Sequence, residues 1–241
     1  MTSSGPLVAI HQPNFFPWLG FFDKIARADI FVVLDDAQFA KSGAGTWCNR
    51  VRLLFNGVPT WMTMPVRRDY HGVRRVNEMA IVNGQPWREK MRRSIRAHYG
   101  RAAFFAAVFP VIERLLDNPT ESLADYNLNG IRAVCEALSI DARRIVLSSS
   151  LAVDALATDR LIGIVKRVGG TAYLTGGGAG GYQEDDKFAA AGIELRYQNF
   201  QHPRYPQGQT DEFVPGLSCL DALLHCGFDG VAALLRPASA V

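Results

Sequence analysis

The stretch that decides the fold runs from Leu7 to Phe39 and reads LVAIHQPNFFPWLGFFDKIARADIFVVLDDAQF. Two apolar runs of strand type, at 7–10 and 30–34, flank a segment with helical spacing that follows Gly20. Polar residues follow each strand directly, and in a parallel α/β sheet ligands bind at the carboxyl ends of the strands. We therefore expect one crevice lined by His11, Gln12, Asp35, Asp36 and Gln38.

The same alternation of elements continues in the C-terminal half. Strands are expected at 144–147, 171–174 and 193–197, and helices at 160–168 and 184–191. We expect Thr158 and Asp159 to cap the first of these helices, and Gly169 and Gly170 to end it. The sequence predicts an α/β fold with a Rossmann-like parallel-sheet core, arranged as a single domain over 1–241 with a mainly helical insertion at 86–138.

Composition narrows the class of protein. With 241 residues and 48% hydrophobic content, the chain can bury a substantial core. No apolar run is long enough to span a bilayer, and the first residues lack the character of a secretory signal, so we expect a cytoplasmic protein. The four cysteines show no Cys-x-x-Cys spacing, which favours reduced thiols. The five histidines are scattered, so no metal site is expected. No bound cofactor is expected either.

The net charge of +3 conceals a strongly basic segment. Residues 67–101 hold ten lysines and arginines against three acidic residues. Within this segment, 87–99 has the spacing of an amphipathic helix, and its buried side would carry Trp87, Met91, Ile95 and Tyr99. The basic side is either a solvated face or a landing site for an anion or an acidic partner. Nucleic acid is not expected, because no binding motif accompanies the charge.

Three groups in the chain could carry chemistry. His11 ends a strand beside prolines, where it could act as a general base or remain a structural histidine. Asp35 and Asp36 would point to opposite faces of a strand, so one could orient the imidazole or bind substrate while the other caps a turn. Cys48 is either a buried inert thiol or the nucleophile of a thioester reaction.

Other residues would bind rather than react. Gln38, Asn49 and Arg50 are expected to line the pocket, and His202 lies in a stiff polar segment that suits its rim. The glycine run at 176–181 lacks the Lys-Ser/Thr of a Walker motif, yet its backbone amides could cradle an anion. A loop without such a role is the alternative interpretation.

The opening motif of the chain resembles that of the WbqC-like protein family, and the similarity extends over nearly the whole sequence. The matching segments are His11-Gln12-Pro13-Asn14-x-x-Pro17-Trp18-x-Gly20-Phe21-Phe22-x-Lys24-Ile25, Asp35-Asp36-x-Gln38-Phe39, Asn49-Arg50, Trp61-x-x-x-Pro65, Tyr173-Leu174-x-Gly176, Tyr182, His202-Pro203-x-Tyr205-Pro206 and Leu217-Ser218-x-x-Asp221. The resemblance implies a biosynthetic role in bacterial surface-polysaccharide or specialised-metabolite pathways, with acyl or aminoacyl transfer to an amine. It adds Asn14, Trp18, Gly176 and Tyr182 to the candidate binding residues.

A weaker, architectural resemblance is to the HIGH-motif nucleotidyltransferases and pantothenate synthetase. In this chain Pro17-Trp18-Leu19-Gly20 occupies the region where His-x-Gly-His would hold phosphates. Adenylyl transfer by that mechanism would therefore lack its main electrostatic support.

We accordingly expect an acyltransferase that moves an acyl group from a carrier-protein thioester to an amine acceptor, either an amino sugar or an amino acid. The alternatives are a nucleotide-binding enzyme with a degenerate HIGH motif and a non-catalytic binding protein. Carrier proteins are usually acidic, so an acyl carrier protein would dock on the basic helix. The docking residues would be Arg88, Lys90, Arg92, Arg93 and Arg96.

Overall fold

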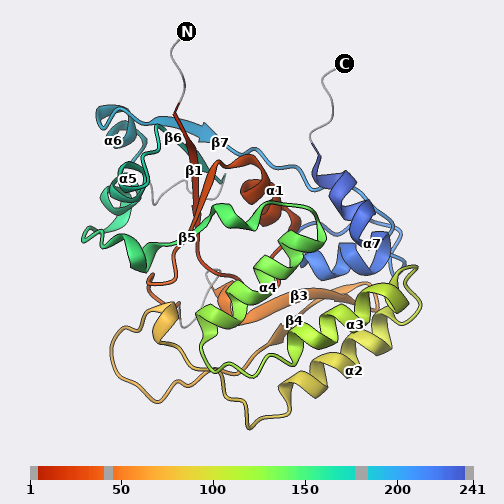
Figure 1. The fold of residues 1–241 in the computed structure, drawn as a ribbon. Coiled ribbons are helices and arrows are strands. Elements are labelled where there is room, and N and C mark those ends of the chain that lie inside the picture. The colour runs from red at the N-terminus through yellow and green to blue at the C-terminus, as the bar shows by residue number, and fades with distance from the viewer. Residues whose placement is uncertain (1–4, 41–45, 177–183, 237–241) are drawn as a thin grey trace, which may run out of the picture. The chain divides into compact units, whose positions relative to one another are not determined.

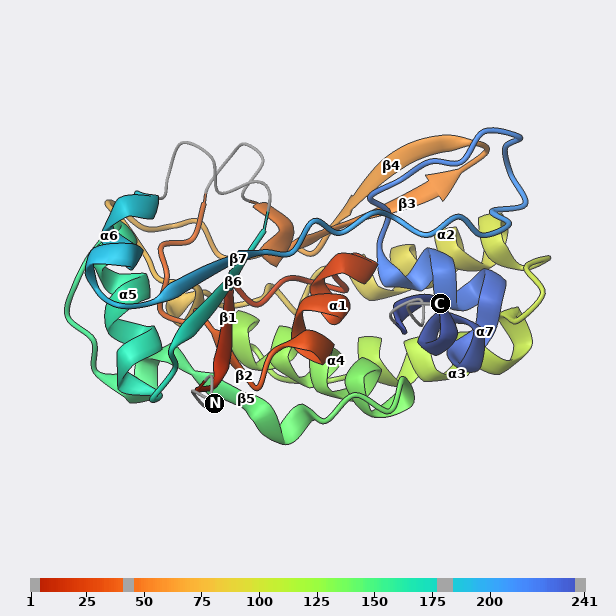
Figure 2. The same ribbon diagram turned by 90° about the horizontal axis from the view of Figure 1, so that it is seen from above.

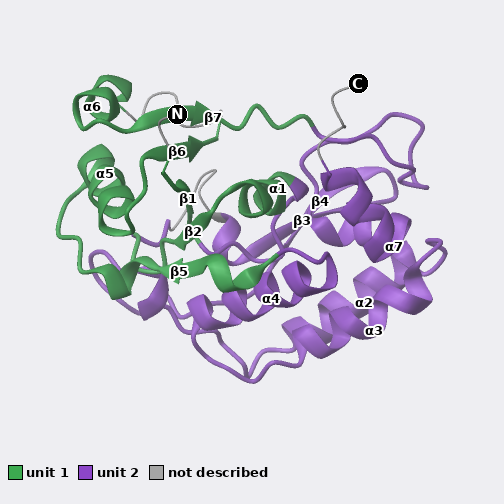
Figure 3. Cartoon of the chain, turned by 45° about the horizontal axis from the view of Figure 1, so that its top comes forward, with its two compact units in different colours: residues 1–12, 20–37, 141–201 green, residues 13–19, 38–140, 202–241 purple. Residues whose placement is uncertain are grey.

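The structure is a computed structural model that describes residues 5–40, 46–176 and 184–236. The chain divides into two compact units, which Figure 3 shows in different colours. Unit 1 comprises residues 1–12, 20–37 and 141–201, and unit 2 comprises residues 13–19, 38–140 and 202–241. The helices of the expected insertion belong to unit 2, and the single-domain description stays a prediction.

Unit 1 is built on a five-stranded sheet in which all neighbouring strands are parallel (Figure 1). Its strands are β1 (Leu7–His11), β2 (Ile30–Val33), β5 (Ile145–Leu147), β6 (Ala172–Thr175) and β7 (Glu194–Tyr197). The spatial order is β5-β2-β1-β6-β7, so counted along the chain it runs 3-2-1-4-5, as in a Rossmann fold. The expected α/β fold with a Rossmann-like core is confirmed.

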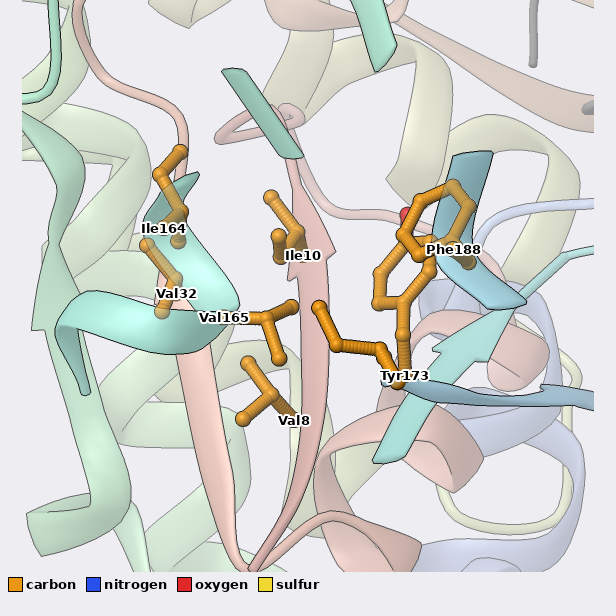
Figure 4. Close-up of a cluster of buried hydrophobic side chains, with 8 residues drawn as sticks. Val8, Ile10, Val32, Ile164, Val165, Tyr173 and Phe188 are labelled. Carbon is orange, nitrogen blue, oxygen red and sulfur yellow. The ribbon is translucent and has the colours of Figure 1, made fainter. Parts of the chain in front are cut away.

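Helices cover both faces of this sheet (Figure 2). On one face the side chains of Val8, Ile10 and Tyr173 belong to a buried apolar cluster (Figure 4). That cluster also includes residues of α5 (Ala157–Arg167) and α6 (Asp185–Ala190). The other face carries α1 (Leu19–Arg27), whose Phe21 ring lies 5.3 Å from the ring of Phe31 in β2.

One detail of the expected helices in unit 1 is wrong. Thr158 and Asp159 do not cap α5, because Leu156 occupies the N-cap position and both residues lie in the first turn. The Thr158 hydroxyl instead accepts a hydrogen bond from the backbone N–H of Glu184, at 3.1 Å. Gly169 has a φ of +75°, so it ends this helix in the left-handed conformation, as expected.

Unit 2 contains an antiparallel hairpin that the sequence analysis missed. Strands β3 (Arg50–Phe55) and β4 (Val58–Thr63) pair along their whole length. Asn56 and Gly57 form the turn, with φ values of 52° and 76°. Asn-Gly between two apolar segments is a strong hairpin signal, because both turn positions need positive φ.

Four α-helices complete the described part of unit 2. They are α2 (Trp87–Tyr99), α3 (Phe105–Leu116), α4 (Leu123–Ala137) and α7 (Cys219–Leu235). The expected buried side of α2, formed by Trp87, Met91, Ile95 and Tyr99, is confirmed. The described residues also form the short 3-10 helices η1 (Thr46–Cys48), η2 (Val76–Glu78), η3 (Ala142–Arg144) and η4 (Ser148–Leu151). None of the helices in the described ranges has the length and apolar character needed to cross a membrane.

Candidate functional site

His11 is the last residue of β1 and lies on the face of the sheet that α1 covers. Side chains alternate between the two faces of a strand, so His11 lies opposite to Val8 and Ile10. Its imidazole ring contacts the Phe21 ring of α1 edge-on, at 5.0 Å between centroids. The Nδ1 atom lies 3.1 Å from the backbone oxygen of Gln12. Because a carbonyl can only accept, Nδ1 carries the proton and Nε2 carries the lone pair.

The strand order places this histidine at the reversal point of the sheet, which is the position where the order of the strands along the chain changes direction. In the order 3-2-1-4-5 that position lies between β1 and β6, and ligands of open α/β sheets bind outside the carboxyl ends of these strands. Ala9 of β1 pairs with Leu174 of β6. Continuing this register by two residues brings His11 level with Gly176, the residue that follows β6.

Lys24 is a functional candidate that the sequence analysis missed. It lies on α1 and is only 6% exposed. A Cβ atom on Gly176 would lie 3.3 Å from Lys24 Nζ, so the ammonium group reaches the end of β6. One signal was present in the sequence, because Lys24 follows the buried Phe21 by three residues and so shares its helical face.

Burial and neighbouring charges set the protonation states of Lys24 and His11. Burial lowers the pKa of Lys24 to about 8, against an opposing effect of the neighbouring Asp23 carboxylate. Burial and, to a lesser extent, the positive charge of Lys24 lower the pKa of His11 to about 4, although the hydrogen bond with Gln12 acts in the opposite direction. At neutral pH the site therefore holds a neutral imidazole beside a lysine that is mostly charged.

The carboxylate next to Lys24 in sequence is engaged by other donors. Asp23 Oδ2 accepts a hydrogen bond from Gln198 Nε2 at 2.7 Å and lies 3.5 Å from Arg27 Nη1. Gln198 Nε2 also donates to the backbone oxygen of Gly20, at 2.6 Å. Within the residues that the structure describes, Lys24 Nζ has no hydrogen bond or ion pair.

Asp35 and Asp36 both lie in the turn after β2, so the expectation that they point to opposite faces of a strand is wrong. Asp35 accepts hydrogen bonds from the backbone N–H and the hydroxyl of Ser149, at 3.0 and 2.6 Å. Asp36 lies 2.5 Å from Arg160 Nη2. The Ser148 hydroxyl is within hydrogen-bond distance of both carboxylates. These contacts tie β2 to η4 and α5, and a catalytic role for either aspartate stays a prediction.

In unit 2 the contacts of Cys48 favour the inert interpretation of this thiol. Cys48 is buried, and its Sγ donates to Asn14 Oδ1 at 3.6 Å. Burial raises the pKa of the thiol to about 12, whereas a nucleophile needs the thiolate. Asn49 is also buried, and its Nδ2 donates to the backbone oxygen of Met64 at 3.0 Å.

The structure brings two of the expected binding residues of unit 2, Trp18 and Arg50, into one aromatic cluster. The Trp47 ring lies 5.1 Å from the Trp18 ring and 4.6 Å from the Trp61 ring. The Arg50 guanidinium lies 4.1 Å from the centre of the Trp61 ring, in cation–π geometry.

The remaining expected residues are placed separately. Gln38 is exposed and pairs through its backbone with Arg75, and His202 is half-buried, which lowers its pKa. Residues 177–181 of the glycine run and Tyr182 lie outside the described residues. Of the expected site residues, His11, Gln12 and Gly176 therefore lie together at the ends of β1 and β6. In the described ranges no three His, Cys, Asp or Glu side chains are gathered so that they could hold a metal ion.

Most of the expected docking arginines on α2 already have partners on or near α3. Arg88 donates to the backbone oxygens of Leu116 and Asn118, at 2.6 and 2.9 Å. Arg92 is paired with Asp117, and Arg96 lies 3.2 Å from Glu113. Lys90 and Arg93 are exposed. The face thus stabilises helix packing, and docking of a carrier protein stays a prediction.

Comparison with known proteins gives one family and one relative. The model of the WbqC-like protein family matches residues 12–233. The uncharacterized protein Rv1507c of Mycobacterium tuberculosis (strain ATCC 25618 / H37Rv) is 28% identical over 223 residues, which cover 91% of this chain and 94% of that protein. No solved structure matches the chain significantly.

Proposed function

Because the chain belongs to the WbqC-like protein family, we propose that it is a biosynthetic acyltransferase that moves an acyl or aminoacyl group from a carrier-protein thioester to an amine. The observation that carries the proposal is the pairing of His11 with Lys24 at the reversal point of the parallel sheet. Acyl transfer needs a proton acceptor for the amine and a positive group for the oxyanion that forms on the thioester carbonyl. A neutral imidazole and a buried ammonium group supply both.

In the proposed reaction, Lys24 and His11 each act in one step. The neutral amine attacks the thioester carbonyl carbon, a C–N bond forms, and the carbonyl oxygen becomes an oxyanion that Lys24 stabilises. His11 Nε2 accepts one proton from the attacking nitrogen. When the intermediate collapses, the C–S bond breaks and the departing thiolate takes this proton from His11. The products are an amide and a free thiol.

The test is turnover by His11→Ala with a panel of small thioester donors and amine acceptors, followed by mass spectrometry. A general base typically contributes about 10²–10⁴-fold, so the variant should lose about that much kcat while remaining folded. His71→Ala is the matched control, because His71 is an exposed histidine of unit 2. Full activity in a folded His11→Ala protein would remove His11 from the mechanism.

A nucleotide-binding enzyme is the second candidate, and the strand order favours it. Rossmann-like sheets bind nucleotides at the reversal point, where Lys24 could contact a phosphate. Calorimetry with ATP and with CTP, each with and without magnesium, separates the two candidates. Saturable magnesium-dependent binding in the micromolar range, about −8 kcal/mol, would favour the nucleotide-binding candidate.

A further inference from the structure

The positive charge of Lys24, at the end of β6, is not balanced by the described residues of unit 1. Lys24 is 6% exposed, and it makes no hydrogen bond or ion pair in the described part of the chain. A buried charge is costly unless it is paired, so a cation retained in such a place points to an anionic partner. No described residue supplies that partner, which favours a ligand as its source.

The groups around Lys24 limit the charge of such a ligand. On its own helix, the Asp23 carboxylate is held by Gln198 and Arg27. On β1, His11 is neutral at neutral pH. Directly after β6, Gly176 presents backbone only, and a side chain there would press against Lys24 Nζ. Among the described groups, one unbalanced positive charge therefore faces the ligand.

A single negative charge balances Lys24 before the reaction, and the three N–H donors of its ammonium group leave one for the oxyanion that forms during transfer. A carboxylate matches one ammonium group, whereas a phosphate dianion would leave an excess negative charge in a buried place. Gly176 adds no side chain beside the ammonium group, where a Cβ atom would lie 3.3 Å from Lys24 Nζ. We propose that the acceptor amine is an amino acid rather than an amino sugar, and that Lys24 binds its carboxylate; this rests on the proposed acyl transfer.

The carboxylate would also act on the base. The Lys24 charge disfavours protonation of His11, so an anion bound to Lys24 offsets that effect and makes the imidazole a better proton acceptor. An acceptor without a carboxylate would leave His11 weakly basic. Recognition of the substrate and activation of the base are thus coupled through one lysine.

The experiment follows the Lys24 and His11 resonances by NMR in protein labelled at lysine and histidine. The chain has five lysines, and Lys24→Met identifies the resonance of Lys24. The probes are acetate, glycine, glycinamide, glucosamine and inorganic phosphate. Acetate and glycine should raise both midpoints by about one pKa unit, and Lys24→Met should weaken their binding about tenfold. Lys166→Met, which removes an exposed lysine of α5, should leave binding unchanged.

Three results would overturn the inference. These are no response of Lys24 to acetate or glycine, an equal response to glycinamide or glucosamine, and a stronger response to phosphate. The readout does not depend on turnover, so the two proposals fail separately. Carboxylate binding that needs Lys24 in a protein without acyl transfer would sink only the proposed function. Transfer to amino sugars that Lys24→Met leaves unchanged would sink this inference and the oxyanion role of Lys24, but not acyl transfer with His11 as the base.

Discussion

Replacing Lys24 with methionine should stabilise the ligand-free protein. Methionine is apolar and of similar length, so it fills the same space without a buried charge. Burial lowers the pKa of Lys24 from 10.5 to about 8. At about 1.4 kcal/mol per pKa unit, the charged form is destabilised by about 3.5 kcal/mol, which is the expected gain of Lys24→Met at pH 7.

The free energy of unfolding should also depend on pH, in a direction that follows from the lowered pKa of Lys24. Between pH 8 and 10.5 the unfolded chain holds the Lys24 proton and the folded protein releases it. The stability of the wild type should therefore rise through this window, because the unfolded state binds more protons there. The difference between Lys24→Met and the wild type is largest below pH 8 and shrinks as the pH approaches 10.5.

Urea unfolding at pH 7 and pH 10 measures both effects. Lys166→Met is the control, because Lys166 is exposed and its removal should change the free energy of unfolding by less than about 0.5 kcal/mol. The reasoning is refuted by a Lys24→Met protein that is less stable than the wild type at pH 7. It is also refuted by a rise in stability above pH 8 that the variant shares in full.

Three further predictions concern His11, Cys48 and the basic helix. Because burial holds the pKa of His11 near 4, wild-type stability should rise between pH 4 and 6.5, and urea unfolding of His11→Asn should lack that part of the rise. Cys48 should react with iodoacetamide only when the protein unfolds, since its thiol is buried with a pKa near 12; rapid alkylation of the native protein at Cys48, located by peptide mass spectrometry, would contradict this. Arg92→Glu should lower the melting temperature because it breaks the pair with Asp117, whereas Arg93→Glu should leave the melting temperature unchanged and slow only a carrier-bound donor, most at low salt. A small thioester should be turned over equally by Arg93→Glu and the wild type.

Local patterns predicted the elements of unit 1 and the basic helix well. The apolar spacing of Trp87, Met91 and Ile95 sufficed for the bounds of α2, because an amphipathic helix has one periodic buried face. The cap at Thr158 was wrong because α5 begins before it and its hydroxyl bonds to Glu184. The hairpin was missed although Asn56-Gly57 marks its turn.

The site was predicted less completely than the fold. The position of His11 follows from the end of an apolar run, which is a local signal. The burial of Lys24 depends on how α1 packs on the sheet, and lysine in a short helix resembles a surface residue. The pairing of Asp35 with Ser149 and of Asp36 with Arg160 joins segments more than a hundred residues apart, which no local pattern encodes.

The central claim is that Lys24 acts electrostatically on a neutral His11 at the reversal point of the sheet. The most direct test is the NMR titration of the His11 imidazole in the wild type and in Lys24→Met. The account predicts a midpoint near 4 in the wild type, proton on Nδ1 in the neutral form, and a higher midpoint in the variant. A His11 midpoint near 6.5 in both proteins, or one that Lys24→Met leaves unchanged, would contradict it.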